Sequence, residues 1–177
     1  MLILNGEHIY LRALEPKDLD FLYLLENNTA IWEISGTVTP YSKHVLQLYL
    51  DNAYRDIYEV KQLRLCICTF NDEPIGLIDL FDFDPQNRKV GVGIVILEDQ
   101  HRNKGYGAEA LQLVNDYVFS SLQVRQLYAN VLEENKASLH LFKKMGYIEV
   151  GIKKDWIYTN GTYKNEILLQ KINTSVH

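Results

Sequence analysis

The sequence predicts a mixed α/β fold in which a mostly antiparallel sheet is flanked by helices. Three observations carry this prediction. Three strand-like segments follow one another with turn residues between them, one long amphipathic helix joins two strands, and Asn160-Gly161 marks a hairpin. No repeat or Pro/Gly/Ser-rich linker interrupts the 177 residues. One domain over residues 1–177 is therefore expected, a common domain length.

The first quarter of the chain combines one strand with two helices. Residues 8–11 alternate as a strand does, and Pro16 then stands where a helix can begin, with Asp18 in its first turn. The pair at 27–28, Asn-Asn, is a stop signal. A second helix is expected after Ser42, because apolar residues recur there at helical spacing.

The middle of the chain reads as a three-strand meander. Residues 64–70, 75–83 and 90–97 are rich in apolar and β-branched residues, and the segments between them carry the turn sequences N-D-E-P and D-P-Q-N. The third segment is apolar on both faces, as a central buried strand would be. An antiparallel arrangement is the simplest for such short connections.

The C-terminal half alternates helices and strands. A long helix is expected from Gly105 to about 122, with an apolar stripe formed by Leu111, Val114, Val118 and Leu122. A strand at 126–132 and a short helix at 136–145 follow, the latter ended by Gly146. Strands at about 147–156 and 162–170 close the chain. The crossing through the long helix requires one parallel strand pair.

Composition excludes several classes of function. The 18 Lys and Arg and 23 Asp and Glu give a formal charge of −5, which argues against general nucleic-acid binding. The N-terminus lacks a basic segment before an apolar run, and the longest apolar stretch, 91–97, is too short to cross a bilayer. A cytoplasmic protein is expected, with Cys66 and Cys68 as reduced core residues and no metal site.

The turn at residues 102–108, R-N-K-G-Y-G-A, follows the buried strand and opens the long helix. The free N–H groups of a helix start attract anions, and glycines let the backbone approach a phosphate closely. The alternative is a glycine-assisted turn with solvated basic residues. A nicotinamide fingerprint is disfavoured, because seven residues separate Leu97 from Gly105 and no acidic residue stands near position 125. A P-loop fails because no Gly-Lys-Ser/Thr triplet exists.

Two motifs make the chain resemble the GCN5-related N-acetyltransferase (GNAT) superfamily. Residues 102–107 match the pattern Q/R-x-x-G-x-G/A of its acetyl-CoA loop. Residues 135–147, N-K-A-S-L-H-L-F-K-K-M-G-Y, match its second motif, 28 positions after Gly107. The resemblance covers nearly the whole chain. Both ends of the chain look like the branch that holds spermidine and ribosomal-protein N-terminal acetyltransferases.

The resemblance implies a sheet with a splayed parallel strand pair that binds acetyl-CoA as cosubstrate. Backbone groups near Val95, Ile96 and Leu97 would bind the pantetheine arm, as an added strand would. Asn135 would cap the short helix and reach the same arm, with N-capping alone as the alternative. Phe142 and Lys144 would lie near the thioester and nucleotide ends. The amides expected to hold the pyrophosphate are those of Arg102, Asn103, Lys104, Gly105, Tyr106, Gly107 and Ala108.

The implied reaction is direct attack of an amine on the thioester, which needs a proton donor and a proton acceptor. Many relatives have Tyr as the donor where this chain has Phe142, and many have Glu on the strand where this chain has Gly91 or Gly93. Ser138 is therefore the candidate acid, with water or Tyr147 as alternatives. Asp79 is the candidate base. Other carboxylates considered for that role are Asp82 and Asp84, of which Asp84 is better explained as a turn former. Glu33, in the loop between the first two helices, could instead contact an acceptor amine.

The acceptor is expected to be a polyamine or small amine, or a protein N-terminus. The acidic run at 79–84 would attract a polyamine cation, although a solvated strand edge is the preferred explanation. Aromatic residues that could shape the acceptor side are Trp32, Tyr41, Tyr49 and Tyr54. The histidines His44, His101 and His140 have no clustered partners and read as surface or packing residues. A catalytically inactive acyl-CoA-binding sensor is the alternative function, and a homodimer or larger homo-oligomer is expected.

Overall fold

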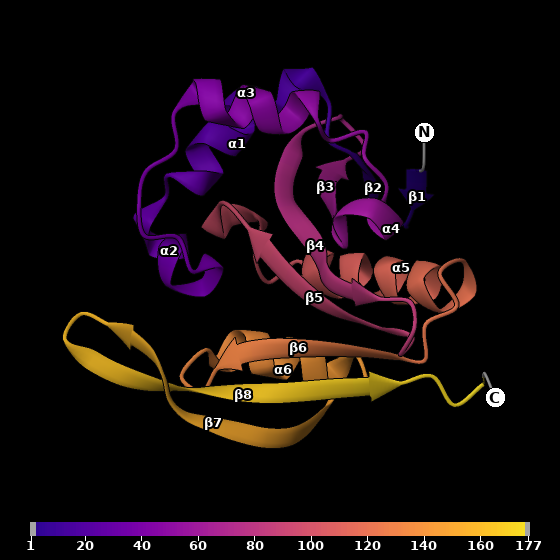
Figure 1. The fold of residues 1–177 in the computed structure, drawn as a ribbon. Helices are drawn as coiled ribbons and strands as arrows, with labels where there is room; N and C mark the ends of the chain where they lie inside the picture. Colours follow the sequence, from indigo (N-terminus) through magenta and orange to yellow (C-terminus); the bar gives the residue numbers. More distant parts are fainter. Residues whose placement is uncertain (1–2, 176–177) are drawn as a thin grey trace.

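The computed structural model describes residues 3–175, which form one continuous sheet with the strand order β1-β2-β3-β4-β5-β6-β8-β7 (Figure 1). The predicted mixed α/β class is confirmed. The strands are β1 (Ile3–Asn5), β2 (Ile9–Ala13), β3 (Leu63–Thr69), β4 (Pro74–Asp84), β5 (Lys89–Ile96), β6 (Gln126–Leu132), β7 (Ile148–Thr159) and β8 (Thr162–Ile172). The helices are α1 (Leu19–Glu26), α2 (Thr29–Ser35), α3 (Lys43–Asp51), α4 (Ile57–Val60), α5 (Tyr106–Ser120) and α6 (Lys136–Lys144), with 3-10 turns at Pro16–Asp18 and Asp99–His101.

One pair of neighbouring strands in the interior of the sheet is parallel, whereas the other pairs are antiparallel. Strands β2 to β5 pair antiparallel in sequence order, which confirms the predicted meander. Strand β5 then pairs parallel with β6, and β8 and β7 continue antiparallel from β6. The connection through α5 forces the parallel step, because a helix returns the chain to the same end of the sheet.

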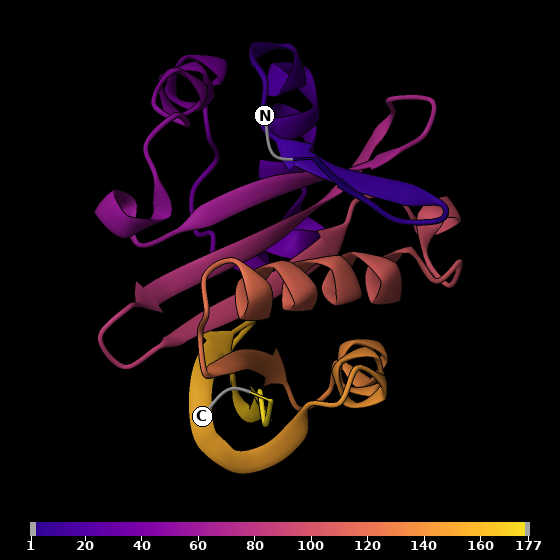
Figure 2. The same cartoon turned by 90° about the vertical axis from the view of Figure 1, so that its right-hand side faces the viewer.

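Alternate residues along the strands point into two separate hydrophobic cores, one on each face of the sheet. On one face, Leu65 and Ile67 of β3 pack with the apolar stripe of α5, and Leu127 extends this core to α6. On the other face, Cys66 and Cys68 pack with α1, α2 and α3. Figure 2 shows α5 crossing one side of the sheet, with the N-terminal helices beyond it. The two cysteines are buried free thiols with their sulfurs 3.6 Å apart.

Three short elements were not predicted. Strand β1 adds to the edge of the sheet at β2, α4 is a single turn, and α2 occupies residues expected to be a loop. The pair Asn27-Asn28 does end α1, but it also starts α2, since Asn28 Oδ1 accepts a hydrogen bond from Ala30 N. Within the described chain, no helix combines the length and apolar character needed to span a bilayer.

Candidate active site

Strands β5 and β6 separate after a short parallel contact. Their pairing covers residues 89–91 and 126–128, whereas β5 continues to Ile96 and β6 to Leu132. The edge of β5 that faces β6 therefore has no strand partner from residue 92 onward. Free backbone groups on such an edge can bind an extended ligand as a neighbouring strand would. The splay that the resemblance implied is confirmed.

A cavity of about 690 Å³ lies at this splay. Its size is that of a typical small-molecule site. The walls come from the end of β5, the turn before α5, the start of α5, and α6, with Ile34 of α2 added from the N-terminal half. Predicted cofactor residues that line it are Val95, Ile96, Arg102, Asn103, Gly105, Gly107, Ala108, Asn135 and Lys144, and the candidate acid Ser138 lines it too.

The glycine-rich turn forms the start of α5 as the sequence suggested. Gly105 is the N-cap residue and has φ of +83°, a left-handed conformation that favours glycine. A Cβ on Gly107 would stand 3.2 Å from Leu141 Cδ2, so glycine lets α5 and α6 approach closely on the cavity wall. Gly107 also lies in the first turn of a 15-residue helix, whose free N–H groups are suited to bind an anion.

Cationic and anionic groups both stand at this end of the cavity. Arg102 and Lys144 line it together with Asp99. Arg102 Nη1 lies 2.7 Å from Asp99 Oδ1, and its Nη2 donates a hydrogen bond to the Ile96 carbonyl at 3.1 Å. One side of the Arg102 guanidinium is thereby fixed against β5. The balance of charge remains positive, which suits a phosphate.

The start of α6 holds two of the predicted residues together. Asn135 Oδ1 accepts a hydrogen bond from Ser138 N at 3.2 Å, so the N-cap role expected for Asn135 is confirmed. Both residues line the cavity with Ala137. Ser138 is thus placed on the wall, within the first turn of α6.

Phe142 does not line the cavity. Its side chain is buried in the core, where its ring packs edge-on against Tyr147 with centroids 5.0 Å apart. Tyr147 OH donates a hydrogen bond to Asn115 Oδ1 at 2.8 Å, and burial raises the pKa of this phenol. Leu141 and His140 stand on the cavity wall instead. Three other predicted cofactor residues also lie off the cavity wall. Leu97 packs against the core beneath α1, α2 and α3, Tyr106 packs against the core beneath α5, and Lys104 is exposed.

His101 and His140 both line the cavity, whereas the sequence predicts them to be ordinary surface or packing residues. His101 has a mostly covered ring whose Nε2 lies 3.9 Å from Glu73 Oε1. The 3-10 turn that carries His101 and the face of α6 that carries His140 are set by the tertiary structure, and no local sequence pattern marks them.

A second cavity, of about 390 Å³, lies on the other face of the sheet, beneath α1, α2 and α3. Asp79 stands on its wall and is held by Arg64. Arg64 Nε lies 2.6 Å from Asp79 Oδ1 and Nη2 lies 3.2 Å from Oδ2, while Nη1 lies 2.6 Å from Glu26 Oε1. The two carboxylates and the one guanidinium give this cavity a formal charge of −1.

Sequence reasoning did not identify Arg64 or Glu26 as site residues. Arg64 stands directly opposite Asp79 in the register of β3 and β4, but a register shift between Ile67 and Cys68 means that this pairing does not follow from the turn sequence alone. Cross-strand pairs of opposite charge are favourable neighbours. Tyr41 and Tyr49 line the second cavity, whereas Tyr54 is largely exposed.

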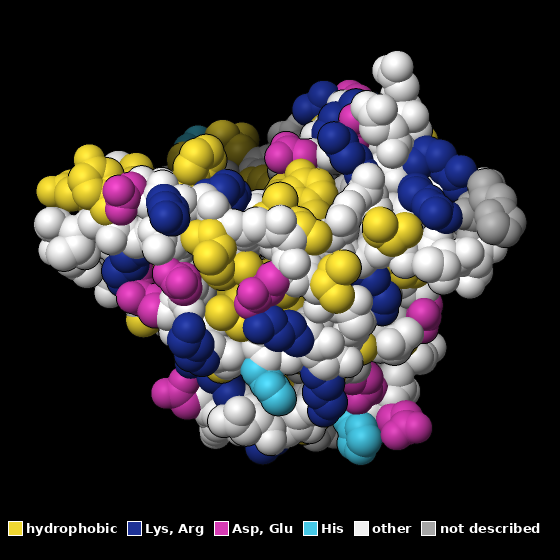
Figure 3. Space-filling view, turned by 90° about the horizontal axis from the view of Figure 1, so that it is seen from below, with side chains coloured by type: hydrophobic (Ala, Val, Ile, Leu, Met, Phe, Trp, Pro, Cys, Tyr) yellow, Lys and Arg dark blue, Asp and Glu magenta, His cyan; other side chains and the backbone are white. Residues whose placement is uncertain are grey.

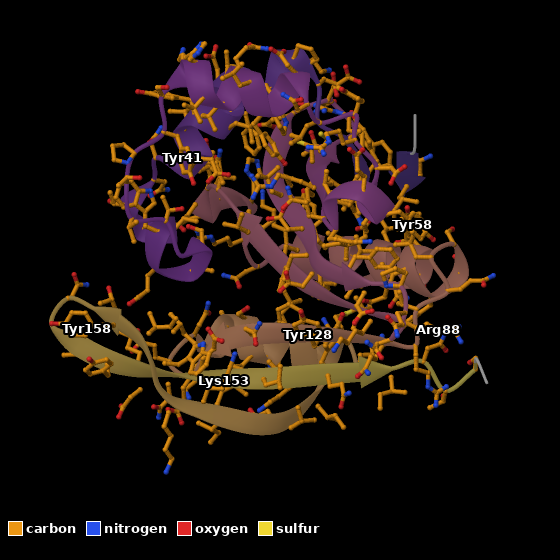
Figure 4. The ribbon with its side chains drawn as sticks, viewed as in Figure 1. Tyr41, Tyr58, Arg88, Tyr128, Lys153 and Tyr158 are labelled. Carbon is orange, nitrogen blue, oxygen red and sulfur yellow. The ribbon has the colours of Figure 1, made fainter. Side chains whose placement is uncertain are left out.

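The strand position that lacks an acid is filled by a neighbouring ring. A Cβ on Gly91 would lie 2.3 Å from Phe81 Cε2, so the ring occupies the space of a side chain there. Phe81 also lines the second cavity and packs edge-on against Tyr128, with centroids 5.8 Å apart. Figure 4 shows Tyr128 on β6, at the splay between β6 and β5. Burial and Asp82 raise the pKa of Tyr128.

The other candidate carboxylates have structural roles. Asp84 accepts hydrogen bonds from the backbone and side chain of Asn87, which confirms it as a turn former. Asp82 has φ of +49° at the irregular end of β4. Glu33 lies on α2, and its Oε1 stands 2.5 Å from Lys164 Nζ. Among residues 3–175, no three His, Cys, Asp or Glu side chains gather as metal ligands would.

Comparison with known proteins identifies the family of this chain. A family model described as an acetyltransferase (GNAT) domain matches residues 8–148. The chain belongs to the GNAT acetyltransferase family. Acetyl-CoA is the cosubstrate of this GNAT acetyltransferase.

Relatives of this GNAT acetyltransferase include enzymes that act on polyamines. Spermidine N(1)-acetyltransferase of Escherichia coli K12 is 28% identical over 163 residues, which are 92% of this chain and 85% of the relative. A putative ribosomal N-acetyltransferase of Bacillus subtilis is 25% identical over 166 residues, 89% and 87% of the two chains. The crystal structure of spermidine N-acetyltransferase from Vibrio cholerae with CoA and spermine superposes with a TM-score of 0.85 at 25% identity, covering 94% of this chain and 96% of the other.

Proposed function

We propose that this acetyltransferase transfers the acetyl group of acetyl-CoA to a primary amine, with a polyamine as the leading acceptor and a small amine or a protein N-terminus as alternatives. The observation that carries the proposal is the pair of cavities that share helix α2 as a wall. One has a glycine turn, a helix start and two cations, which suit a diphosphate. The other is acidic, which suits an ammonium group.

The residues on the walls fit acetyl-CoA. The exposed edge of β5 would hold the pantetheine arm, and the turn from Arg102 to Ala108 would hold the pyrophosphate. Lys144 would stand near the nucleotide. Asn135 would support the arm from the start of α6. When bound, acetyl-CoA supplies the activated acyl carbon that the amine attacks.

Two side chains are proposed for the proton transfers. Ser138 would donate a proton to the leaving sulfur, because it is the hydroxyl on the cavity wall at the start of α6. Asp79 would accept the proton released by the amine. Arg64 keeps the Asp79 carboxylate oriented, and replacing Asp79 with Asn should lower kcat by roughly 10²-fold, the low end for general base catalysis.

The polyamine acceptor rests on charge. A polyamine carries several ammonium groups, whereas a protein N-terminus carries one, so an acidic cavity favours the polyamine. The E. coli and V. cholerae relatives, which are named for spermidine, support the same acceptor. A location in the cytoplasm agrees with two buried free thiols, which are typical of a reducing compartment.

A homo-oligomer is proposed from the surface of the β7–β8 hairpin. Strand β7 is the edge of the sheet, and Trp156, Tyr158 and Tyr163 are each more than half exposed. Hydrophobic side chains of the hairpin tip stand at the left end of the face in Figure 3. A V. cholerae spermidine N-acetyltransferase is described as dodecameric. Light scattering of the purified protein would give the mass of the assembly, and a monomer at micromolar concentration would contradict the proposed homo-oligomer.

The test of the function is a panel of amines with acetyl-CoA and detection of the released thiol. Spermidine and spermine, peptides with free N-termini, and small amines form its three arms. Turnover is expected first in the polyamine arm. Absence of turnover in all three arms, together with CoA binding by calorimetry, would establish instead the acyl-CoA-binding sensor that Phe142 and Gly91 also allow.

A further inference from the structure

An ion-pair cluster joins parts of the chain that are far apart in sequence. Lys164 of β8 lies between Glu33 of α2, whose Oε1 is 2.5 Å from Lys164 Nζ, and Glu134, in the turn between β6 and α6. The Lys164 side chain is about one-fifth exposed, at 21%. The two carboxylates raise the pKa of Lys164, so it carries its charge at any physiological pH.

Glu33 depends on this lysine. Its Oε1 atom is shielded from solvent, and the described residues show the ion pair with Lys164 as the polar contact of this oxygen. The ammonium of Lys164 is therefore the group that compensates the buried oxygen. Removing one partner of a covered ion pair costs more than the pair itself is worth, because the remaining charge is left without compensation.

Helix α2 touches both proposed substrate sites. Ile34 lines the cofactor cavity, whereas Ser35 and Thr37 line the acidic cavity. The helix is seven residues long and lies near the β7–β8 hairpin in Figure 1. Its position over the splay therefore affects both cavities at once.

The attachment of α2 differs on its two sides. Toward α1 it is packed by Ile31, which is buried in the second core, and by a hydrogen bond from Trp32 Nε1 to the Glu26 carbonyl at 2.8 Å. Toward the β6–β8 layer, Glu33–Lys164 is the ion pair of α2 found among the described residues. Gly36 ends the helix in a left-handed conformation with open space around it, and the chain directly beyond it is tied back to α2 by the hydroxyls of Ser35 and Thr37, which lie 2.8 Å apart.

We propose that Lys164 is a positioning residue, which pairs with Glu33 and Glu134 and thereby holds α2 over the splay between β5 and β6. In this position Ile34 covers the cofactor cavity, and Ser35 and Thr37 stay beside the acidic one. The inference rests on the proposed placement of acetyl-CoA and amine in these two cavities. Lys164 is assigned no contact with the reacting atoms.

Loss of the lysine leaves Glu33 and Glu134 facing each other across the same gap, with repulsion in place of attraction. Helix α2 should then separate from the β6–β8 layer while the rest of the fold remains. The acceptor site is expected to lose more affinity than the cofactor site, because Ser35 of α2 and Thr37, which follows directly after the helix, line the former, whereas Ile34 is the α2 residue on the latter.

The test uses Lys164→Ala and Glu33→Gln, with Lys164→Arg as the conservative variant. Lys143→Ala is the matched control, since Lys143 pairs with Glu149 at 2.7 Å and touches neither α2 nor a cavity wall. Hydrogen exchange followed by mass spectrometry reports the order of residues 29–37. Steady-state kinetics with acetyl-CoA and spermidine gives the KM for the amine and kcat separately, and calorimetry gives the Kd for CoA.

Lys164→Ala and Glu33→Gln should each speed exchange at residues 29–37 and raise the KM for the amine about tenfold, equivalent to about 1.4 kcal/mol. The Kd for CoA and kcat should stay within about twofold, and Lys164→Arg and Lys143→Ala should resemble the wild type. Unchanged exchange at 29–37 in both disrupting variants, or equal changes in the control, would overturn the proposal. If the wild type acetylates no amine, the exchange result still decides whether Lys164 holds α2, so failure of the proposed function is recognised separately.

Discussion

The packing of Phe81 over Gly91 makes a quantitative prediction for Gly91→Ala. An added Cβ would stand 2.3, 2.5 and 2.8 Å from three carbons of the ring, whereas ordinary contact begins at 3.4 Å. The ring must therefore retreat by roughly 1 Å. Tyr128 packs edge-on against the ring at 5.8 Å and restricts that movement. Gly91 does not have a positive φ, so the cost is one of packing and involves no backbone strain.

The expected cost of Gly91→Ala is about 1–3 kcal/mol in the free energy of unfolding, the range for inserting a methyl group into a filled site. The displaced ring also narrows the acidic cavity, because Phe81 lines it. The KM for the amine should therefore rise. The affinity for CoA should stay unchanged, since Gly91 is not on the wall of the cofactor cavity.

The assay is urea unfolding with linear extrapolation, applied to a double-mutant cycle with Phe81→Ala. In the Phe81→Ala background, Gly91→Ala should cost much less, because the obstructing ring is gone. Gly93→Ala is the control, as its Cβ would meet Phe81 Cε1 at an ordinary 3.9 Å. Equal costs for Gly91→Ala and Gly93→Ala, or no coupling between positions 81 and 91, would refute this reasoning.

Three further predictions follow from the sites described. Gly107→Asp should weaken CoA binding at least tenfold through like charge beside the diphosphate, and an unchanged Kd by calorimetry would contradict the assignment of the glycine turn. Ser138→Ala should lower kcat by roughly 10²-fold with little change in the Kd for CoA, whereas wild-type turnover in the thiol-release assay would assign the proton to water. Hydrogen bonds from Lys17 and Tyr10 lower the pKa of Asp72 from 3.8 to about 2, so its contribution to stability is present above pH 3.8 and is lost as the pH falls toward 2. Asp72→Asn should flatten this part of the stability profile in urea unfolding between pH 4 and 2, and an unchanged slope would exclude the role of this carboxylate.

Much of the fold was predictable because it rests on local signals. The meander, the helix after Gly105 and the hairpin at Asn160-Gly161 follow from strand alternation, a glycine N-cap and turn chemistry, and the structure contains all three. Helix α2 was missed because its seven residues show no apolar stripe of useful length. It is stabilised by Ile31 in the core and by the cap of Asn28, and only the second of these is visible in the sequence.

The residues of the candidate site were likewise predictable only in part. The wall residues of the glycine turn and of the start of α6 were expected from two contiguous motifs. Leu141 and His140 replace Phe142 on the wall, since the rotation of α6 against the core decides which side chains face the cavity. Asp79, the candidate base, lines the acidic cavity, but its partners Arg64 and Glu26 were not identified from the sequence.

By itself, the sequence determined where most strands and helices lie, which glycine-rich turn opens the long helix, and to which family the chain belongs. The tertiary structure alone decided that Arg64 joins Glu26 to Asp79, that Phe81 fills the space over Gly91, and that Lys164 reaches Glu33. The first set depends on neighbours within a few positions, so it can be read along the chain. The second set depends on strand register and on how helices pack against the sheet, which bring together residues up to 131 positions apart only after the whole core has formed.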